Sequence, residues 1–145
     1  MYKRILLPTD GSDPSRRAIL AGVDFARGMG AEVVAMTATP DFHTFTADAQ
    51  MLEQTRDEYL AASRAHGQRL LDEVAAAARD AGVPCAQVAV VSDDPYEAII
   101  ATARDQRCDL IVMASHGRKG IKAMLLGSET QKVLVHSAIP VLVHR

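Results

Sequence analysis

The sequence predicts a doubly wound α/β domain built on a parallel, five-stranded sheet. Five short apolar runs rich in Val, Ile and Leu recur along the chain, within residues 2–10, 31–38, 85–91, 109–115 and 139–144. Such runs are typical of strands buried on both faces. The stretches between them carry apolar residues at spacings of three and four, which predicts helices. Strands alternating with helices indicate right-handed crossovers that place helices on both faces of the sheet.

The predicted helix starts carry capping signals. Asp13-Pro14 and Asp94-Pro95 each offer an N-cap acceptor followed by a proline, which is favoured at the first helical position. Glu97 would complete a capping box with Asp94. We therefore expect helices to begin at both places.

The predicted helix ends are marked by glycines. Gly28 or Gly30, and later Gly82, follow the last periodic residues of two helices, where a left-handed conformation often ends the helix. A helix over residues 50–81 would be about 48 Å long at a rise of roughly 1.5 Å per residue. Because that is long for so small a domain, we expect fraying or a kink near Gly67.

Length and composition limit the classes of function. The chain has 145 residues, 48% of them hydrophobic, which suits a single domain over residues 1–145. A net charge of −2 gives no field that would attract a polyanion, so no nucleic-acid partner is expected. No apolar run approaches the roughly 20 residues of a membrane span, and no signal-peptide pattern opens the chain. We expect a cytoplasmic protein without a membrane partner.

The candidate site follows from the topology. Ligands of open parallel sheets bind beyond the carboxyl ends of the strands, where the winding direction reverses. With the strand order 3-2-1-4-5, this point lies between the first and fourth strands. Residues 8–13 and 114–120 should therefore face each other across a crevice. Neither P-loop spacing nor a dinucleotide fingerprint is present, since the turn after the first strand contains only Gly11.

The segment after the fourth strand has features of an anion-binding loop. Gly117 allows the backbone to approach a ligand closely, and Gly127-Ser128 opens a helix whose free amides would suit a phosphate. Positive charge nearby comes from Arg118, Lys119 and Lys122. The same helix start has another interpretation, because Ser128 and Gln131 would form a capping box that needs no ligand.

These segments resemble the universal stress protein family over the whole chain. Nucleotide-binding members of that family carry G-x-x-G-x(9)-G-[ST] after the fourth strand. Here Gly117, nine residues and Gly127-Ser128 match the second half of the pattern, and Ala114 stands where the first glycine usually lies. "ILLPTDGS" and "VHSAIPVLVHR" are similar to the family's first strand and turn and to its last helix and strand. The resemblance implies a Rossmann-like fold of the adenine nucleotide alpha hydrolase type.

The resemblance also implies a binding site for ATP, with Mg²⁺ carried by the nucleotide. Toward the base and the ribose, the implied residues are Pro8, Thr9, Asp10, Ala38 and Met113. Along the triphosphate they are Ala114, His116, Gly117, Arg118, Gly127, Ser128, Glu129 and Thr130. His116 is interpreted as a contact to solvent or phosphate and not as a catalytic residue, because no Ser or Cys nucleophile is paired with it.

The implied function is ATP binding in stress response or signalling, with slow or no hydrolysis. The apolar terminal run "PVLVHR" predicts an exposed sheet edge that pairs with a second copy, and the family associates in this way. Residues 40–50 form a long connection that is interpreted as a lid or a partner surface.

Two alternatives remain. The first is a dimeric interaction protein that no longer binds nucleotide, which Ala114 favours. The second is a receiver or flavin carrier; a receiver would need paired acids after the first strand and a Lys after the fifth, where this chain ends at Arg145.

Overall fold

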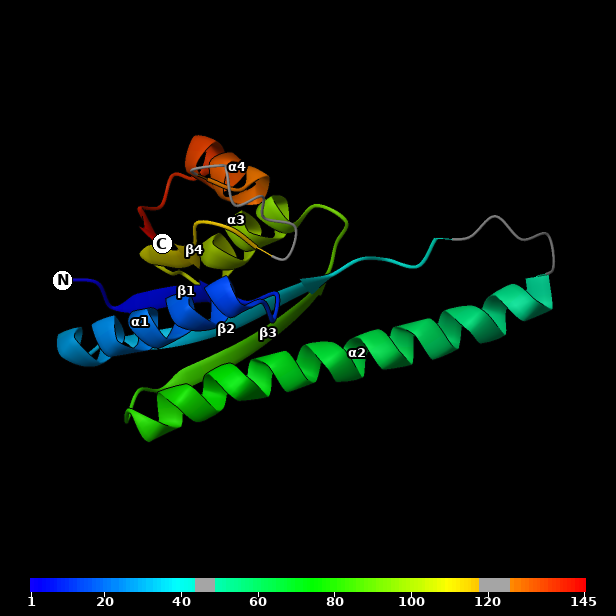
Figure 1. The fold of residues 1–145 in the computed structure, drawn as a ribbon, viewed down its shortest axis with the longest axis horizontal. Helices are drawn as coiled ribbons and strands as arrows, with labels where there is room; N and C mark the ends of the chain where they lie inside the picture. Colours follow the sequence, from blue (N-terminus) through cyan, green and yellow to red (C-terminus); the bar gives the residue numbers. More distant parts are fainter. Residues whose placement is uncertain (44–48, 118–125) are drawn as a thin grey trace.

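The computed structural model has the predicted architecture (Figure 1). It describes residues 1–43, 49–117 and 126–145, of which 49–52 are described as backbone only. The strands are β1 (Arg4–Pro8), β2 (Glu32–Thr39), β3 (Cys85–Val91), β4 (Leu110–Ala114) and β5 (Val141–His144). The helices are α1 (Asp13–Met29), α2 (Ala49–Asp80), α3 (Pro95–Asp105) and α4 (Ser128–His136). The strands pair in parallel in the order β3-β2-β1-β4-β5, which confirms the predicted fold class.

Two apolar layers hold the sheet between its helices. In Figure 1, α1 and α2 lie on one face of the sheet, and α3 and α4 on the other. The central strand β1 contributes to both layers, because Ile5 and Leu7 pack toward α1 and α2 while Leu6 packs on the opposite side. All three side chains have an exposed fraction of 0%. Burial on both faces explains why the sequence of β1 is a continuous apolar run.

The observed caps differ from the predicted ones. The N-cap of α1 is Ser12, whose side chain accepts a backbone N–H, so Asp13 is the first helical residue and not the cap. Asp94 does precede α3, but its side chain makes no capping hydrogen bond. The Glu97 carboxylate instead accepts the hydroxyl of Tyr96 at 3.0 Å. The predicted Asp94–Glu97 capping box is therefore wrong.

Helices α1, α2 and α3 are each followed by a residue in the left-handed conformation. These residues are Gly30 (φ 67°), Gly82 (φ 71°) and Arg107 (φ 57°). The N–H of the residue after each bonds to a carbonyl five residues earlier: Ala31 to Ala26, Val83 to Ala78 and Cys108 to Ala103. This is the Schellman arrangement. The glycine pattern predicted the first two ends, with Gly30 and not Gly28 as the stop, but gave no signal for Arg107.

Helix α2 is continuous over 32 residues, so the predicted kink near Gly67 is wrong. Gly67 lies where the helix meets β2: a Cβ built there would be 3.4 Å from Cγ2 of Thr37. The glycine therefore permits close packing and does not break the helix. The amino-terminal part of α2 extends past the sheet (Figure 1), and side chains 53–58 are exposed. Domain size therefore does not limit the helix. Although α2 is long, neither it nor any other helix in the described residues has the apolar length to cross a membrane.

The described start of the predicted 40–50 loop is tied to its surroundings. The Tyr59 hydroxyl of α2 donates to the carbonyl of Pro40 at 3.1 Å. Nε2 of His43 lies 2.8 Å from a carboxylate oxygen of Asp93, which follows β3. This hydrogen bond from His43 is the main cause that lowers the pKa of Asp93. The rest of the proposed lid, residues 44–50, lies outside the residues whose side chains are described.

Candidate functional site

The carboxyl ends of β1 and β4 meet where the winding of the sheet reverses. Strand β1 pairs with β2 on one side and with β4 on the other, and the two crossovers leave in opposite directions. A Cβ built on Gly117 would lie only 2.6 Å from Oδ2 of Asp10. The turn after β1 and the segment after β4 are therefore in contact, at the place that topology predicts for a ligand.

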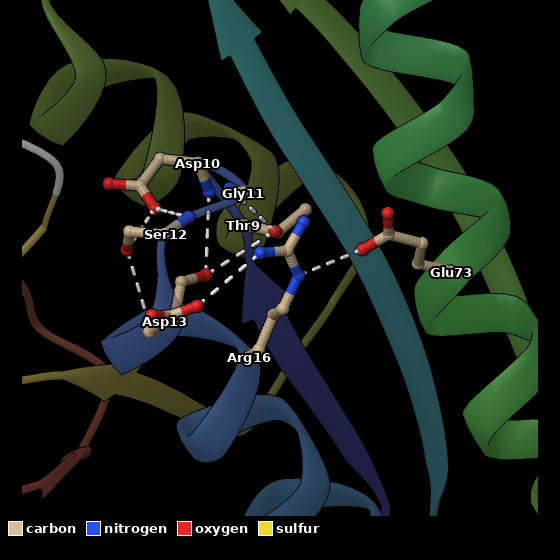
Figure 2. A network of polar contacts seen from close by, with 8 residues as sticks. Thr9, Asp10, Gly11, Ser12, Asp13, Arg16 and Glu73 are labelled. Atoms are coloured by element: carbon tan, nitrogen blue, oxygen red, sulfur yellow. Dashed lines mark hydrogen bonds and ion pairs between the residues drawn. The ribbon is translucent and has the colours of Figure 1, made fainter.

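Hydrogen bonds within the turn after β1 fix Asp10 (Figure 2). One carboxylate oxygen of Asp10 accepts the backbone N–H of Ser12 at 2.9 Å and its hydroxyl at 2.6 Å. The Thr9 hydroxyl oxygen accepts the N–H of Gly11 at 3.2 Å and the hydroxyl of Ser15 at 3.3 Å. Gly11 has a φ of 79°, which favours glycine in this turn. The turn thus presents Asp10 in one orientation.

An ion pair links the first turns of α1 to helix α2. Arg16, in the first turns of α1, donates through Nε to the Glu73 carboxylate of α2 at 3.2 Å, and Figure 2 shows its side chain reaching across to α2. The hydrogen bond that Arg16 donates to Glu73 is the main cause that raises the pKa of Arg16. Both side chains are about half exposed, so the pair contributes little to stability.

The two glycines of the sequence motif are neighbours in space. The backbone N–H of Gly127 donates to the carbonyl of Ser115 at 2.6 Å. A Cβ on Gly127 would lie 3.3 Å from that carbonyl oxygen, 3.4 Å from the Cα of His116 and 3.9 Å from the backbone nitrogen of Gly117. The carboxyl end of β4 and the start of α4 are therefore in contact at these glycines. A side chain at Gly127 would press on the backbone of Ser115 and His116.

Helix α4 begins at that point without a side-chain cap. Its N-cap is Gly127 and not Ser128, and no capping hydrogen bond from a side chain is found among the described residues. Gln131 donates its amide to the carbonyl of Leu126 at 2.9 Å, so the predicted Ser128–Gln131 capping box is wrong. The free N–H groups of a first turn are what an anion binds at a helix start.

Thr130 and Glu129 dock the first turn of α4 on its neighbours. The buried Thr130 donates its hydroxyl to the carbonyl of Ala114, the last residue of β4, at 2.9 Å. Glu129 turns its carboxylate toward α3, where it accepts the backbone N–H of Tyr96 at 2.9 Å. Only the backbone of Glu129 is therefore placed to serve the site in the way the sequence suggested.

The other predicted residues lie in an apolar layer, near the ends of β1 and β4, or outside the described part of the chain. Ala38 and Met113, near the ends of β2 and β4, belong to the apolar layer on the α3 and α4 side. Pro8 ends β1, and Nδ1 of His116 lies 3.1 Å from the hydroxyl of Ser115. Arg118, with Lys119 and Lys122, lies outside the described residues.

Sequence reasoning missed the hydroxyls that hold the site together. These are the side chains of Ser12 and Ser15 beside Asp10. Serines two and five positions after an aspartate that follows a strand are a usable signal, because they suit local turn and capping hydrogen bonds. Within the described ranges, no three His, Cys, Asp or Glu side chains gather in a way that would hold a metal ion.

These features define a doubly wound α/β domain in which Asp10, Gly117 and Gly127 lie at the switch point of the sheet. The chain belongs to the universal stress protein family, whose family model matches residues 1–145. Universal stress protein MJ0531 of Methanocaldococcus jannaschii is 32% identical over 143 residues, which cover 99% of this chain and 82% of that protein.

Solved structures of relatives have the same fold. The structure of MJ0577, a universal stress protein of Methanocaldococcus jannaschii, matches with a TM-score of 0.84 at 29% identity, covering 99% of this chain and 95% of that chain. A universal stress protein solved in complex with cAMP matches with a TM-score of 0.73 at 28% identity, covering 99% of this chain and 97% of that one. The family predicted from the glycine spacing and the chain ends is thus confirmed.

Proposed function

We propose that this protein binds ATP in the crevice between β1 and β4 and acts in stress response or signalling in the cytoplasm, with slow or no hydrolysis. The observation that carries the proposal is the meeting of Gly117 and Gly127 beside the start of α4, where no side-chain cap is found in the described part of the chain. Backbone amides at a helix start, approached through glycines, suit a phosphate group. The complex of a related universal stress protein with cAMP supports an adenine nucleotide as the ligand.

The carboxylate of Asp10 is the group that we assign to the ribose end of the nucleotide. It lies against Gly117 and is held by the turn after β1. A carboxylate accepts hydrogen bonds from sugar hydroxyls, and it is also a ligand that Mg²⁺ prefers. Mg²⁺ would screen the charge of the phosphates, and Asp10 fits it as a single protein ligand beside the nucleotide's own oxygens.

Calorimetry with ATP and Mg²⁺ tests the proposal. The parent protein is expected to release or absorb heat on titration, and Asp10→Ala should bind at least about tenfold more weakly, since a hydrogen bond to a charged group contributes roughly 1.5–3 kcal/mol. Circular dichroism should show that the variant is folded, because the Thr9 and Ser15 contacts remain. No heat and no thermal shift for the parent at millimolar ATP would favour the alternative, an interaction protein that does not bind nucleotide. Ala114, in place of the motif's first glycine, is the feature that supports that alternative.

We also propose a homodimer formed through β5. This strand lies at one edge of the sheet, and Leu142 on it is 37% exposed. Leu134 and Val135 on the adjacent α4 are 42% and 75% exposed. A second copy paired along β5 would cover apolar surface of this kind.

Light scattering tests the dimer. At micromolar concentration the mass should be twice the 15.6 kDa of the chain. Leu142→Arg should move it toward the monomer, because a charge would be buried in the interface. A monomer mass for the parent protein, unaltered in the variant, would contradict the dimer.

A further inference from the structure

The start of α4 is held by contacts on two sides. Toward β4, the Gly127 N–H binds the Ser115 carbonyl and the Thr130 hydroxyl binds the Ala114 carbonyl. Toward α3, the Glu129 carboxylate accepts a hydrogen bond from the backbone N–H of Tyr96. The first two contacts set the distance between the first turn of α4 and the end of β4. The third links it to a neighbouring helix.

Glu129 supplies the cap that α3 lacks. Asp94, the N-cap residue of α3, makes no side-chain capping bond, so the N–H of Tyr96 in the first turn of α3 depends on a partner from elsewhere. Glu129 accepts this N–H at 2.9 Å through one oxygen. Its other oxygen lies 3.4 Å from Nζ of Lys132, one turn further along α4. The carboxylate is thereby held at the amino-terminal end of α3, where a negative charge is favourable.

The contacts around Tyr96 extend this link along both helices. Nζ of Lys132 lies 5.4 Å from the centre of the Tyr96 ring, and the His136 ring lies 5.5 Å from it. The Tyr96 hydroxyl donates to Glu97. Residues from α4 therefore contact the first turn of α3 over two helical turns. A shift of α4 relative to α3 would break all of these contacts together.

We propose that Glu129 is a positioning residue for the triphosphate. By binding the Tyr96 N–H, it fixes the first turn of α4 in the orientation in which its free N–H groups receive phosphates. It also keeps its own negative charge directed at α3. This inference rests on the proposed ATP site, and it assigns the Glu129 side chain an effect on affinity through α3, without contact to the nucleotide.

Three variants separate this role from a general effect of charge or stability. Glu129→Ala removes the acceptor, whereas Glu129→Gln keeps an oxygen that can accept the Tyr96 N–H but removes the charge. Glu97→Ala is the matched control, because it deletes a carboxylate that accepts the Tyr96 hydroxyl and not the Tyr96 N–H. Each variant is titrated by calorimetry with ATP and with adenosine, which lacks phosphates.

The expected result is a loss specific to phosphate. Glu129→Ala should weaken ATP binding about tenfold, as for a lost hydrogen bond to a charged group, and change adenosine binding less than about twofold. Glu129→Gln and Glu97→Ala should stay within about threefold of the parent for both ligands. Equal ATP affinity in Glu129→Ala and the parent would overturn the proposal. So would tighter ATP binding in both Glu129 variants, which would assign the residue a repulsive role.

Amide hydrogen exchange of the unliganded protein tests the positioning without nucleotide. Glu129→Ala should speed exchange at Tyr96, which loses its acceptor, and at Gln131, whose N–H bonds to the Gly127 carbonyl in the first turn of α4. Glu129→Gln should restore slow exchange at both. If the parent fails to bind ATP, the proposed function fails, yet faster exchange in Glu129→Ala would still support the positioning. Unchanged exchange at both amides would overturn it.

Discussion

Gly127→Val is expected to abolish ATP binding while the domain stays folded. The backbone at Gly127 has φ −68° and ψ 159°, which valine adopts readily, so the turn itself is not strained. A valine side chain does not fit in the space available, because even a Cβ would lie 3.3 Å from the Ser115 carbonyl oxygen and 3.4 Å from the Cα of His116. Its two methyl groups would push the backbone of Ser115 and His116 away from Gly127. They would also fill space that we assign to a phosphate beside the first turn of α4. We expect at least a hundredfold loss of affinity, about 2.7 kcal/mol.

Calorimetry with ATP on a graded set of variants measures this loss. Gly127→Ala should have an intermediate affinity, since its single methyl requires only a small movement of the neighbouring backbone. Gly28→Ala is the matched control, because a Cβ there meets nothing within 4 Å and the residue lies in α1, away from the crevice. Unaltered affinity in folded Gly127→Val would place the phosphates elsewhere.

The sequence predicted what depends on pattern, and failed where a tertiary contact decides. Strands that are buried on both faces of a parallel sheet are apolar throughout, so the apolar runs were enough to predict the five strands. The cap of α3 comes from Glu129, which lies 33 positions after Tyr96. Capping rules consider only residues close to the helix start, so they could not predict it. Fraying or a kink near Gly67 was predicted from the length of α2, since the close packing of Gly67 on Thr37 of β2 cannot be inferred from the sequence.

The candidate site shows the same division. The spacing of Gly117 and Gly127 predicted a loop, and the structure shows why both positions lack side chains: each lies against a backbone or carboxylate atom of the neighbouring segment. Asp13 was predicted as the cap of α1, but the cap is Ser12, one residue earlier, because its side chain accepts the backbone N–H of Ser15.

The contact between α1 and β1 predicts strong coupling between two core positions, Leu7 and Gly22. Leu7 is fully buried, and its Cδ2 lies 2.5 Å from the place that a Cβ on Gly22 would occupy, with Cγ1 of Val112 at 3.4 Å. Leu7→Ala should lower the free energy of unfolding by about 2–5 kcal/mol, because it leaves a cavity. Gly22→Ala should lower it by about 1 kcal/mol, since overpacking of roughly 1–3 kcal/mol exceeds the gain of about 1 kcal/mol in helix propensity.

The double variant should be less destabilised than the sum of the two single ones. The methyl group that Gly22→Ala introduces would fill part of the space that Leu7 leaves, so we expect a coupling free energy of about 1–2 kcal/mol. Urea denaturation of the parent, both single variants and the double variant gives this value from four midpoints at a common slope. Gly28→Ala combined with Leu7→Ala is the control and should be additive, since Gly28 has open space around it. Additivity within about 0.3 kcal/mol for Leu7 and Gly22 would show that α1 shifts to make room, and that the close approach of α1 to β1 does not limit the side chain at position 22.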